Sequence, residues 1–397
     1  MTAQPASGDR PFTILANLLH APAELTGTGH YAREIIAAMQ ELPRPPRVVG
    51  IVSPSNARSF EIPGAPALEL LEWGHDFGFL LARRMEEWAL LDLLIRKQKA
   101  DVFWGPSNFL PLWRTGPMVV TIHDMTFFKD ATYLSALRGM YWRAWTRRTA
   151  QVADLILTVS DAAKADILKH LPMDPARVTV IRNGVSSRFF VSGDRDGYAK
   201  RLHTLRDRFH DLPETYALFV GTITAHKNLP RLIDALAAAR KATGEDIRLV
   251  LAGKRGHDAD RVFAAIERNG LGNAVVELGY VPDGFLPALY ENARLHILPS
   301  FTEGFGLPIV EAMAAGAPVL TGDRGAMAEV AGDAAITCNP VDVDAWARGL
   351  ARLWTDARLR RDLRARGIER AREFTWARAA ERTLQALRMA AGQSPAV

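Results

Sequence analysis

The chain has 397 residues, of which 48% are hydrophobic and 23% are charged, and this composition excludes a disordered or fibrous protein. The formal net charge of +5 favours anionic ligands or surfaces without requiring nucleic acid. The single cysteine, Cys338, excludes an intrachain disulfide and a multi-cysteine zinc site. Residues 1–11 have no apolar signal core and no apolar run reaches transmembrane length, so we expect a cytoplasmic protein.

Strand-like and helical segments alternate along the chain, which predicts an α/β fold with two mostly parallel sheets. The polar stretch 186–214 has little strand signal and is predicted to connect two domains. We place the domains at 1–190 and 191–374, with a C-terminal helix at about 375–397 that packs back on the first domain. The predicted strands are 12–18, 47–52, 101–104, 118–122, 155–159, 178–182, 216–221, 247–252, 274–279, 295–298, 318–321 and 334–338.

A glycine loop with Gly27 and Gly29 follows the first strand and precedes a helix predicted over 30–40. Glycines before a helix let the backbone approach a phosphate, so we favour a phosphate-binding loop over one that only caps the helix. The loop also matches the G-x-G-x-x-A pattern of dinucleotide-binding proteins. The eight residues between Leu18 and Gly27, and the lack of an acidic residue after the second strand, argue against NAD.

Two further strands end in polar residues, where parallel sheets face their ligands. His123 and Asp124 follow strand 118–122, and this position favours a functional histidine over a structural one. Asp124 is a candidate to orient the imidazole, although neighbours in an extended chain point apart. Lys227 follows strand 216–221 and precedes a helix that begins near Leu229. A lysine there can neutralise a departing diphosphate, and a solvated loop lysine is the alternative.

The pair Glu303 and Glu311 is the most informative feature of the chain. A buried strand, 295–298, leads into a glycine turn, and Pro308 suits the first turn of a helix. The N–H groups and the dipole at a helix N-terminus attract phosphate. Two acids that are eight residues apart in a mostly helical segment lie on the order of 10 Å apart. This spacing fits the hydroxyls at the two ends of a nucleotide-sugar.

Two other segments are weaker candidates. Asp342 and Asp344 resemble an Asp-x-Asp metal motif, but acids at the start of a helix are expected on dipole grounds. The segment 138–148 mixes aromatic residues with arginines on a predicted helix. Such a helix either lies on an anionic membrane, which makes the protein peripheral to the inner membrane, or packs its tryptophans in the core with a solvated arginine face.

Together these motifs resemble the retaining glycosyltransferases of family 4, which have the GT-B fold of two Rossmann-like α/β/α domains that face each other across a cleft. The resemblance is carried by "PSFTEGFGLPIVEAMAAGAPVL" around Glu303 and Glu311, by "TVSDAAKADIL" at 158–168 and by "VIRNGV" at 180–185. It implies transfer of a sugar from a nucleotide diphosphate to an acceptor hydroxyl with retention of the anomeric configuration. It also implies that the enzyme needs no metal and no other cofactor.

The resemblance also implies roles for individual residues. In the family, the residue at Glu303 contacts the donor sugar, the one at Glu311 contacts the ribose, and the one at Lys227 binds the diphosphate. His123 matches the active-site histidine near the sugar, and the glycine loop lies against the diphosphate from the other domain. Backbone N–H groups that hold sugar and phosphate belong to Phe305, Gly306 and Leu307.

One departure from the family lies at the diphosphate. Many members have an arginine directly after the glycine that matches Gly221, and this chain has Thr222 there. A subgroup has the arginine directly before the lysine, and this chain has His226 there. We therefore expect stabilisation of the leaving group to depend on Lys227, with help from His226 when it is protonated.

The contexts "TIHDMTFF" and "GTITAHKN" resemble mannosyltransferase members, so GDP-mannose is the best guess for the donor. UDP- and dTDP-sugars remain open, and the implied acceptor is a glycan or a lipid-linked saccharide. Functions of another class are an NAD-dependent oxidoreductase, which lacks its ribose acid here, and an inactive nucleotide-sugar-binding module. A phosphorylase or epimerase on the same fold is disfavoured by the family context.

Overall fold

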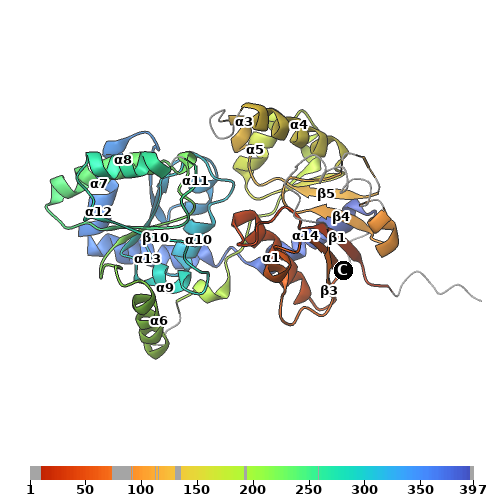
Figure 1. Cartoon of the computed structure of the whole chain (residues 1–397), viewed down its shortest axis with the longest axis horizontal. Helices are drawn as coiled ribbons and strands as arrows, with labels where there is room; N and C mark the ends of the chain where they lie inside the picture. The colour runs from red at the N-terminus through yellow and green to blue at the C-terminus, as the bar shows by residue number, and fades with distance from the viewer. Residues whose placement is uncertain are drawn as a thin grey trace, which may run out of the picture. The chain divides into compact units, whose positions relative to one another are not determined.

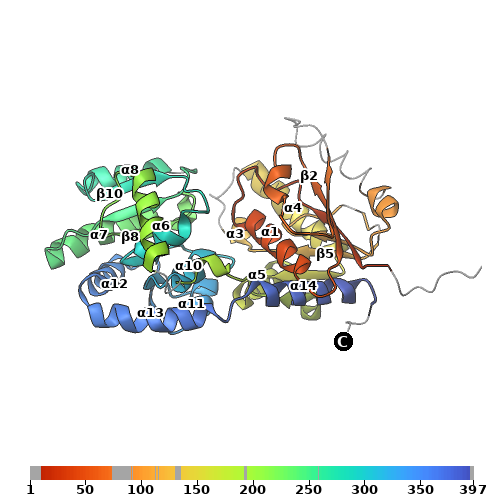
Figure 2. The ribbon, with the colours of Figure 1, turned by 90° about the horizontal axis from the view of Figure 1, so that it is seen from below.

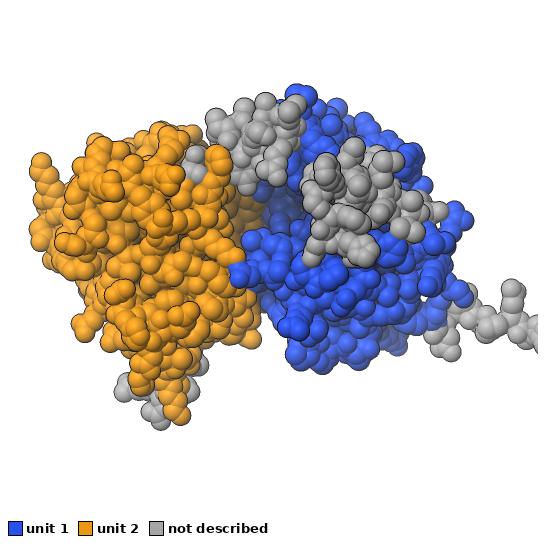
Figure 3. All heavy atoms as spheres, viewed as in Figure 1, with its two compact units in different colours: residues 1–184, 376–397 blue, residues 185–375 orange. Residues whose placement is uncertain are grey.

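A computed structural model of the chain describes residues 10–73, 91, 93–111, 113–114, 116–129, 136–191, 195–257 and 259–393. The chain forms two compact units (Figure 3). Unit 1 comprises residues 1–184 and 376–397, and unit 2 comprises residues 185–375. The polar start at 1–9 and the last residues of the predicted terminal helix, 394–397, lie outside the described residues.

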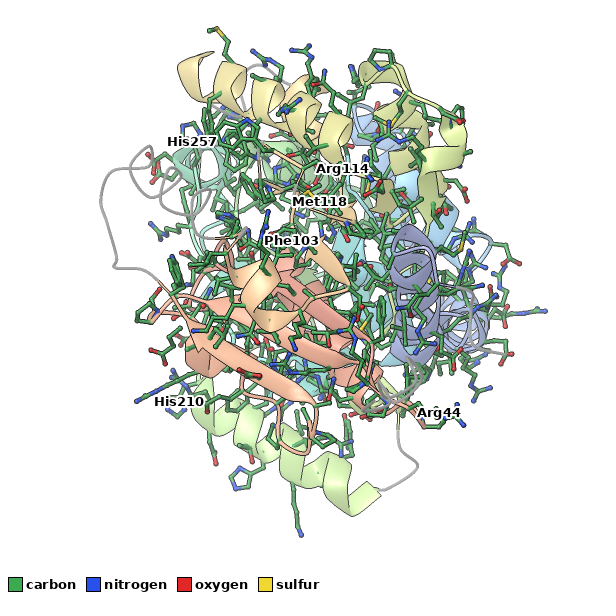
Figure 4. All side chains as sticks on the ribbon, turned by 90° about the vertical axis from the view of Figure 1, so that its right-hand side faces the viewer. Arg44, Phe103, Arg114, Met118, His210 and His257 are labelled. Carbon is green, nitrogen blue, oxygen red and sulfur yellow. The ribbon has the colours of Figure 1, made fainter. Side chains whose placement is uncertain are left out.

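A parallel sheet forms the centre of unit 1 (Figure 1). Its strands are β1 (Thr13–Asn17), β2 (Arg47–Val52), β3 (Leu68–Glu72), β4 (Val102–Gly105), β5 (Met118–Thr121), β6 (Leu155–Thr158) and β7 (Val178–Val180). The strand order is β3-β2-β1-β4-β5-β6-β7. Successive strands are therefore added on one side of β1 up to β3 and on its other side from β4 onward, so the strand order reverses between β1 and β4. The register partners Phe103 and Met118, labelled in Figure 4, belong to its buried core.

Helices flank this sheet. They include α1 (Gly27–Gln40), α3 (Thr126–Lys129), α4 (Ala136–Val152), α5 (Asp161–His170), α14 (Trp376–Ala390) and the short 3-10 helices η1 (Ala57–Phe60) and η2 (Pro175–Arg177). The Ser160 side chain accepts a hydrogen bond from the N–H of Ala163, which fixes the start of α5. The last helix, α14, packs beside α1 in unit 1 (Figure 2).

Unit 2 repeats the plan with a second parallel sheet. Its strands are β8 (Ala217–Val220), β9 (Leu249–Ala252), β10 (Val275–Gly279), β11 (Leu295–Leu298), β12 (Val319–Gly322) and β13 (Ala335–Cys338). The order β10-β9-β8-β11-β12-β13 reverses between β8 and β11. All residues of β9, β11 and β12 are buried, as expected for parallel strands that are covered on both faces.

The helices of unit 2 pack on its sheet and on one another. They include α6 (Arg195–Arg208), α7 (Leu229–Thr243), α8 (Ala259–Arg268), α9 (Leu286–Asn292), α10 (Leu307–Ala314), α11 (Gly325–Ala331), α12 (Val343–Thr355) and α13 (Ala357–Ala371), with the 3-10 helices η3 (Ser187–Phe189) and η4 (Ala225–Lys227). Helix α7 packs against α12, and α10 packs against α13. These contacts hold α7 and α10, the helices that follow β8 and β11, in place within unit 2.

The predicted fold class is confirmed, and each of the twelve predicted strands forms. Two differences concern polar segments. Strand β3 was not predicted because its sequence, LELLE, contains two glutamates and no fully buried residue, as suits an edge strand. The segment 186–214 is not a bare connection, because it contains η3 and α6, and α6 packs on α9 within unit 2.

Candidate active site

The reversal of the second sheet brings together the loops that follow β8 and β11. Ligands of such sheets bind at the carboxyl ends of the strands at this point. The β8 loop passes very close to the end of β9, since a Cβ on Gly253 would lie 2.0 Å from the carbonyl oxygen of Gly221. Both glycines have positive φ angles, 147° for Gly221 and 156° for Gly253, so larger residues do not fit. The next residue, Thr222, is exposed.

Asn228 fixes the end of the β8 loop. It has a left-handed backbone with φ 57° and joins η4 to α7. Its buried side-chain amide donates to the carbonyl oxygens of Pro299 at 3.1 Å and Pro340 at 2.7 Å. The loops after β8, β11 and β13 are thereby tied together next to Lys227. Sequence reasoning missed Asn228, although an asparagine directly before a helix was a signal for a special backbone.

Lys227 and Glu303 form an ion pair at this point. The Nζ–Oε1 distance is 2.6 Å, and the side chains are only 13% and 14% exposed. The buried Ser300 hydroxyl donates to the same oxygen at 2.5 Å. Burial alone would raise the pKa of Glu303, but the charge of Lys227, then that of His226, and the two hydrogen bonds hold it below its ordinary value. Glu303 is therefore a carboxylate with one oxygen already occupied.

His226 lies beside this pair. Its Nδ1 is 3.0 Å from the hydroxyl of Thr224, and its carbonyl oxygen accepts from the N–H of Phe301 at 2.9 Å. The imidazole is thus anchored within the loop, and its charge contributes to the low pKa of Glu303. The structure brings together His226, Lys227 and Glu303, which the sequence placed in one diphosphate and sugar site.

The N-terminus of α10 supplies the second half of the site in unit 2. Gly306, whose φ angle is 96°, directly precedes the helix, and Leu307 and Pro308 are its first two residues. Pro308 has no N–H, and the N–H of Ile309 donates to the carbonyl oxygen of Gly306 at 2.9 Å, so the N–H of Leu307 is the first-turn donor that an anion could use. Glu311, half-buried on α10, accepts a hydrogen bond from the hydroxyl of Tyr290 at 3.0 Å. Phe305 is buried against Phe374, with ring centroids 5.6 Å apart, so its side chain anchors the turn.

His123 is positioned in unit 1 by the loop that follows β4. Its Nε2 lies 2.8 Å from the carbonyl oxygen of Pro106, so Nε2 carries the proton of the neutral ring and Nδ1 is the accepting nitrogen. Burial lowers the pKa of His123, although the Pro106 carbonyl and Asp124 oppose this effect. Asp124 instead accepts from the N–H of Thr126 at 2.8 Å and so caps α3. Pro106, rather than Asp124, orients the imidazole.

Sequence reasoning missed the residues that support His123. The side chain of Asn108, which has φ 57°, accepts from the backbone N–H of His123 at 3.3 Å. The ring of the buried Tyr31 stands edge-on to the imidazole at 4.7 Å, and its hydroxyl lies 3.2 Å from that of Thr121. These contacts join segments far apart in the chain, so no local sequence pattern predicts them.

The predicted glycine loop is part of a helix. Helix α1 begins at Gly27, three residues before its predicted start, so Gly27 and Gly29 lie in its first turn. A Cβ on Gly29 would approach Leu25 to 2.9 Å, which gives this glycine a packing reason. Gly27 is exposed, and a Cβ there would meet nothing within 4 Å. The start of α1 therefore has room for a ligand beside Gly27, whereas Gly29 is buried.

The weaker candidates have plain structural roles. Asp342 caps α12, because its side chain accepts from the N–H of Ala345. Within the described ranges, no group of three or more His, Cys, Asp or Glu side chains is arranged to hold a metal ion. On α4, Trp145 is buried and its ring lies 6.2 Å from that of Phe109, which agrees with core packing. None of the helices in the described part of the chain is both long and apolar enough to cross a membrane.

Comparisons with known proteins agree with this geometry. The family described as Glycosyltransferase Family 4 matches residues 25–189, and the family described as Glycosyl transferases group 1 matches residues 203–373. O-antigen chain mannosyltransferase B of Escherichia coli is 33% identical over 310 residues, 78% of each chain. The serotype-specific mannosyltransferase WbdA of E. coli is 30% identical over 235 residues, which cover 59% of this chain and 28% of WbdA.

Solved structures share the architecture. HepE of Anabaena, crystallised with UDP and glucose, superposes with a TM-score of 0.75 at 17% identity over 95% of this chain and 100% of HepE. The two Rossmann-like units are those of the GT-B fold. The chain belongs to the family 4, or group 1, glycosyltransferases. It is a glycosyltransferase of the mannosyltransferase-like kind, and this membership excludes the NAD-dependent oxidoreductase.

Proposed function

We propose that the chain transfers mannose from GDP-mannose, with retention of the anomeric configuration, to a hydroxyl of a glycan or lipid-linked saccharide. The observation that carries this proposal is the arrangement in unit 2 of a largely buried cation, Lys227 on the loop after β8, paired with the carboxylate Glu303, with Glu311 on the adjoining helix. The choice of mannose is supported by the name and identity of the O-antigen mannosyltransferase relative.

In the proposed donor complex, the diphosphate lies at the N-terminus of α10 and at Lys227, with His226 as a second cation when it is protonated. Fixed donors aimed at a developing charge lower a barrier most in a site that excludes water. Ser300 and Lys227 both donate to Oε1 of Glu303, so the second carboxylate oxygen is the one to accept from a hexose hydroxyl. Glu311 accepts from the ribose.

The proposed reaction takes place on one face of the sugar. The bond between the anomeric carbon and the diphosphate oxygen breaks, the acceptor oxygen bonds to the same carbon, and the acceptor proton passes to the departing phosphate oxygen. No carboxylate has to serve as a base, and no metal takes part. NMR of the product tests this step directly, because an inverted anomeric configuration would refute it.

A thermal-shift panel tests the donor. GDP, UDP, dTDP, ADP and their sugars are added without metal to the wild type, to Glu311→Ala and to Glu369→Ala, a control that removes an exposed glutamate on α13. A ligand at 100 times its dissociation constant stabilises the folded state by about 2.7 kcal/mol. We expect GDP and GDP-mannose to stabilise the wild type and the control but not Glu311→Ala. A shift with UDP or dTDP species alone would overturn the donor and keep the enzyme class.

A further inference from the structure

A buried tyrosine holds the carboxylate that we assign to the ribose. Tyr290 lies on α9, and its hydroxyl is 3.0 Å from Oε2 of Glu311 on α10. A carboxylate has two oxygens with about four accepting positions, so the hydrogen bond from Tyr290 restricts the orientation of Glu311 without using all of these positions. Glu311 is the fifth of the eight residues of α10, and its orientation decides whether that capacity faces the nucleotide.

The ring of Tyr290 has little freedom to move. It is fully buried, and its ring centroid lies 6.0 Å from that of Phe189 and 5.3 Å from that of His296 on β11, with both rings edge-on. Burial, followed by the charge of Glu311, raises the pKa of the Tyr290 phenol well above its ordinary value. The hydroxyl therefore keeps its proton and donates a hydrogen bond to the carboxylate. A rigid donor of this kind limits the positions that Glu311 can adopt.

We propose that Tyr290 is a positioning residue that orients Glu311 to accept hydrogen bonds from the ribose hydroxyls of the donor nucleotide. This inference rests on the proposed function of Glu311. The hydrogen bond acts before the ligand arrives, so the carboxylate needs no reordering when the nucleotide binds. Tyr290 itself touches neither the sugar nor the phosphates in this scheme.

A merely structural role for the hydroxyl is the alternative, and the chain contains a matched example. Tyr216 is also buried in unit 2, and its hydroxyl donates to the backbone carbonyl of Leu289 at 2.8 Å, one residue before Tyr290. Tyr216→Phe and Tyr290→Phe each delete one buried hydroxyl of the same kind. Of the two changes, Tyr290→Phe removes a hydrogen bond to Glu311, whereas Tyr216→Phe removes one to a backbone carbonyl.

Calorimetric titration of the full chain with GDP and with 2′,3′-dideoxy-GDP separates the two roles. The ratio of the two dissociation constants measures the ribose contacts, and it does not depend on how much of a variant is folded. We expect Tyr290→Phe to reduce the preference for GDP about tenfold, while Tyr216→Phe leaves it unchanged. In a Glu311→Ala background, Tyr290→Phe should change the ratio no further.

An unchanged ratio in Tyr290→Phe, or an equal loss with and without Glu311, would overturn the positioning role and leave the proposed function intact. If the wild type binds UDP rather than GDP, UDP and its 2′,3′-dideoxy analogue replace the pair, with the same expectations. If the wild type binds no nucleoside diphosphate, or does not distinguish the dideoxy form, the assignment of Glu311 to the ribose fails first and takes this inference with it.

Discussion

Removing the cation of the buried pair should reveal how strongly it stabilises unit 2. Lys227→Met removes the ammonium donor to Glu303 at the sheet reversal and leaves the hydrogen bond from Ser300. Deleting one partner of a buried ion pair costs about 3–5 kcal/mol, and because these side chains are 13% and 14% exposed we expect about 3 kcal/mol at pH 7. For a unit of this size, that loss is a fall in Tm of roughly 6–12 °C.

Differential scanning calorimetry of the ligand-free chain measures this loss as a function of pH. The pKa of Glu303 is lowered in the folded wild type, so the stabilisation is present above the ordinary value of 4.5 and disappears as the pH falls through the folded pKa. The gap between Lys227→Met and wild type should therefore close in acid. The double variant Lys227→Met/Glu303→Gln should recover most of the loss. A gap that is independent of pH, or no recovery, would refute the reasoning.

Three further outcomes are expected. Asn228→Ala should destabilise unit 2 by about 2–3 kcal/mol in thermal unfolding, through backbone strain at φ 57° and two unpaired carbonyls, and Asn228→Gly should cost less because the strain is absent. Burial lowers the pKa of His296 to about 3, so between about pH 6.5 and 3 only the unfolded chain binds this proton. The free energy of unfolding therefore decreases as the pH is lowered through this range, and His296→Leu should make that decrease smaller in acid unfolding. Reversing the charges of Arg143, Arg147 and Arg148 should weaken flotation with anionic vesicles, and equal flotation would remove the membrane role of α4.

Much of the fold was predictable because parallel strands are buried on both faces and so read as short apolar runs, as in β9 and β11. The acidic pair was equally visible, since Glu303 and Glu311 flank a glycine turn and a helix start within one continuous segment. Local spacing therefore specified the N-terminus of α10 and the two carboxylates beside it.

The supporting contacts were not predictable, because they join distant parts of the chain. Nothing local links Asn228 to Pro340, which lie 112 positions apart, or Tyr290 on α9 to the acid on α10. The start of α1 at Gly27 was missed because two glycines disfavour a helix, and tertiary packing, including the close fit at Gly29, overrides that preference. Strand β3 was missed because an edge strand can keep its charges in water.

Because the amide of Asn228 donates to carbonyls of two other loops, the position of the adjacent Lys227 depends on three loops at once. The carbonyl of Pro340 belongs to the turn between β13 and α12, which carries no residue assigned to the donor. An insertion or deletion in that turn would shift the amide, and with it Lys227, which directly precedes Asn228. With Lys227 in its proposed role, relatives that differ in this turn should differ in their affinity for a nucleoside diphosphate even where every side chain proposed to face the ligand is the same.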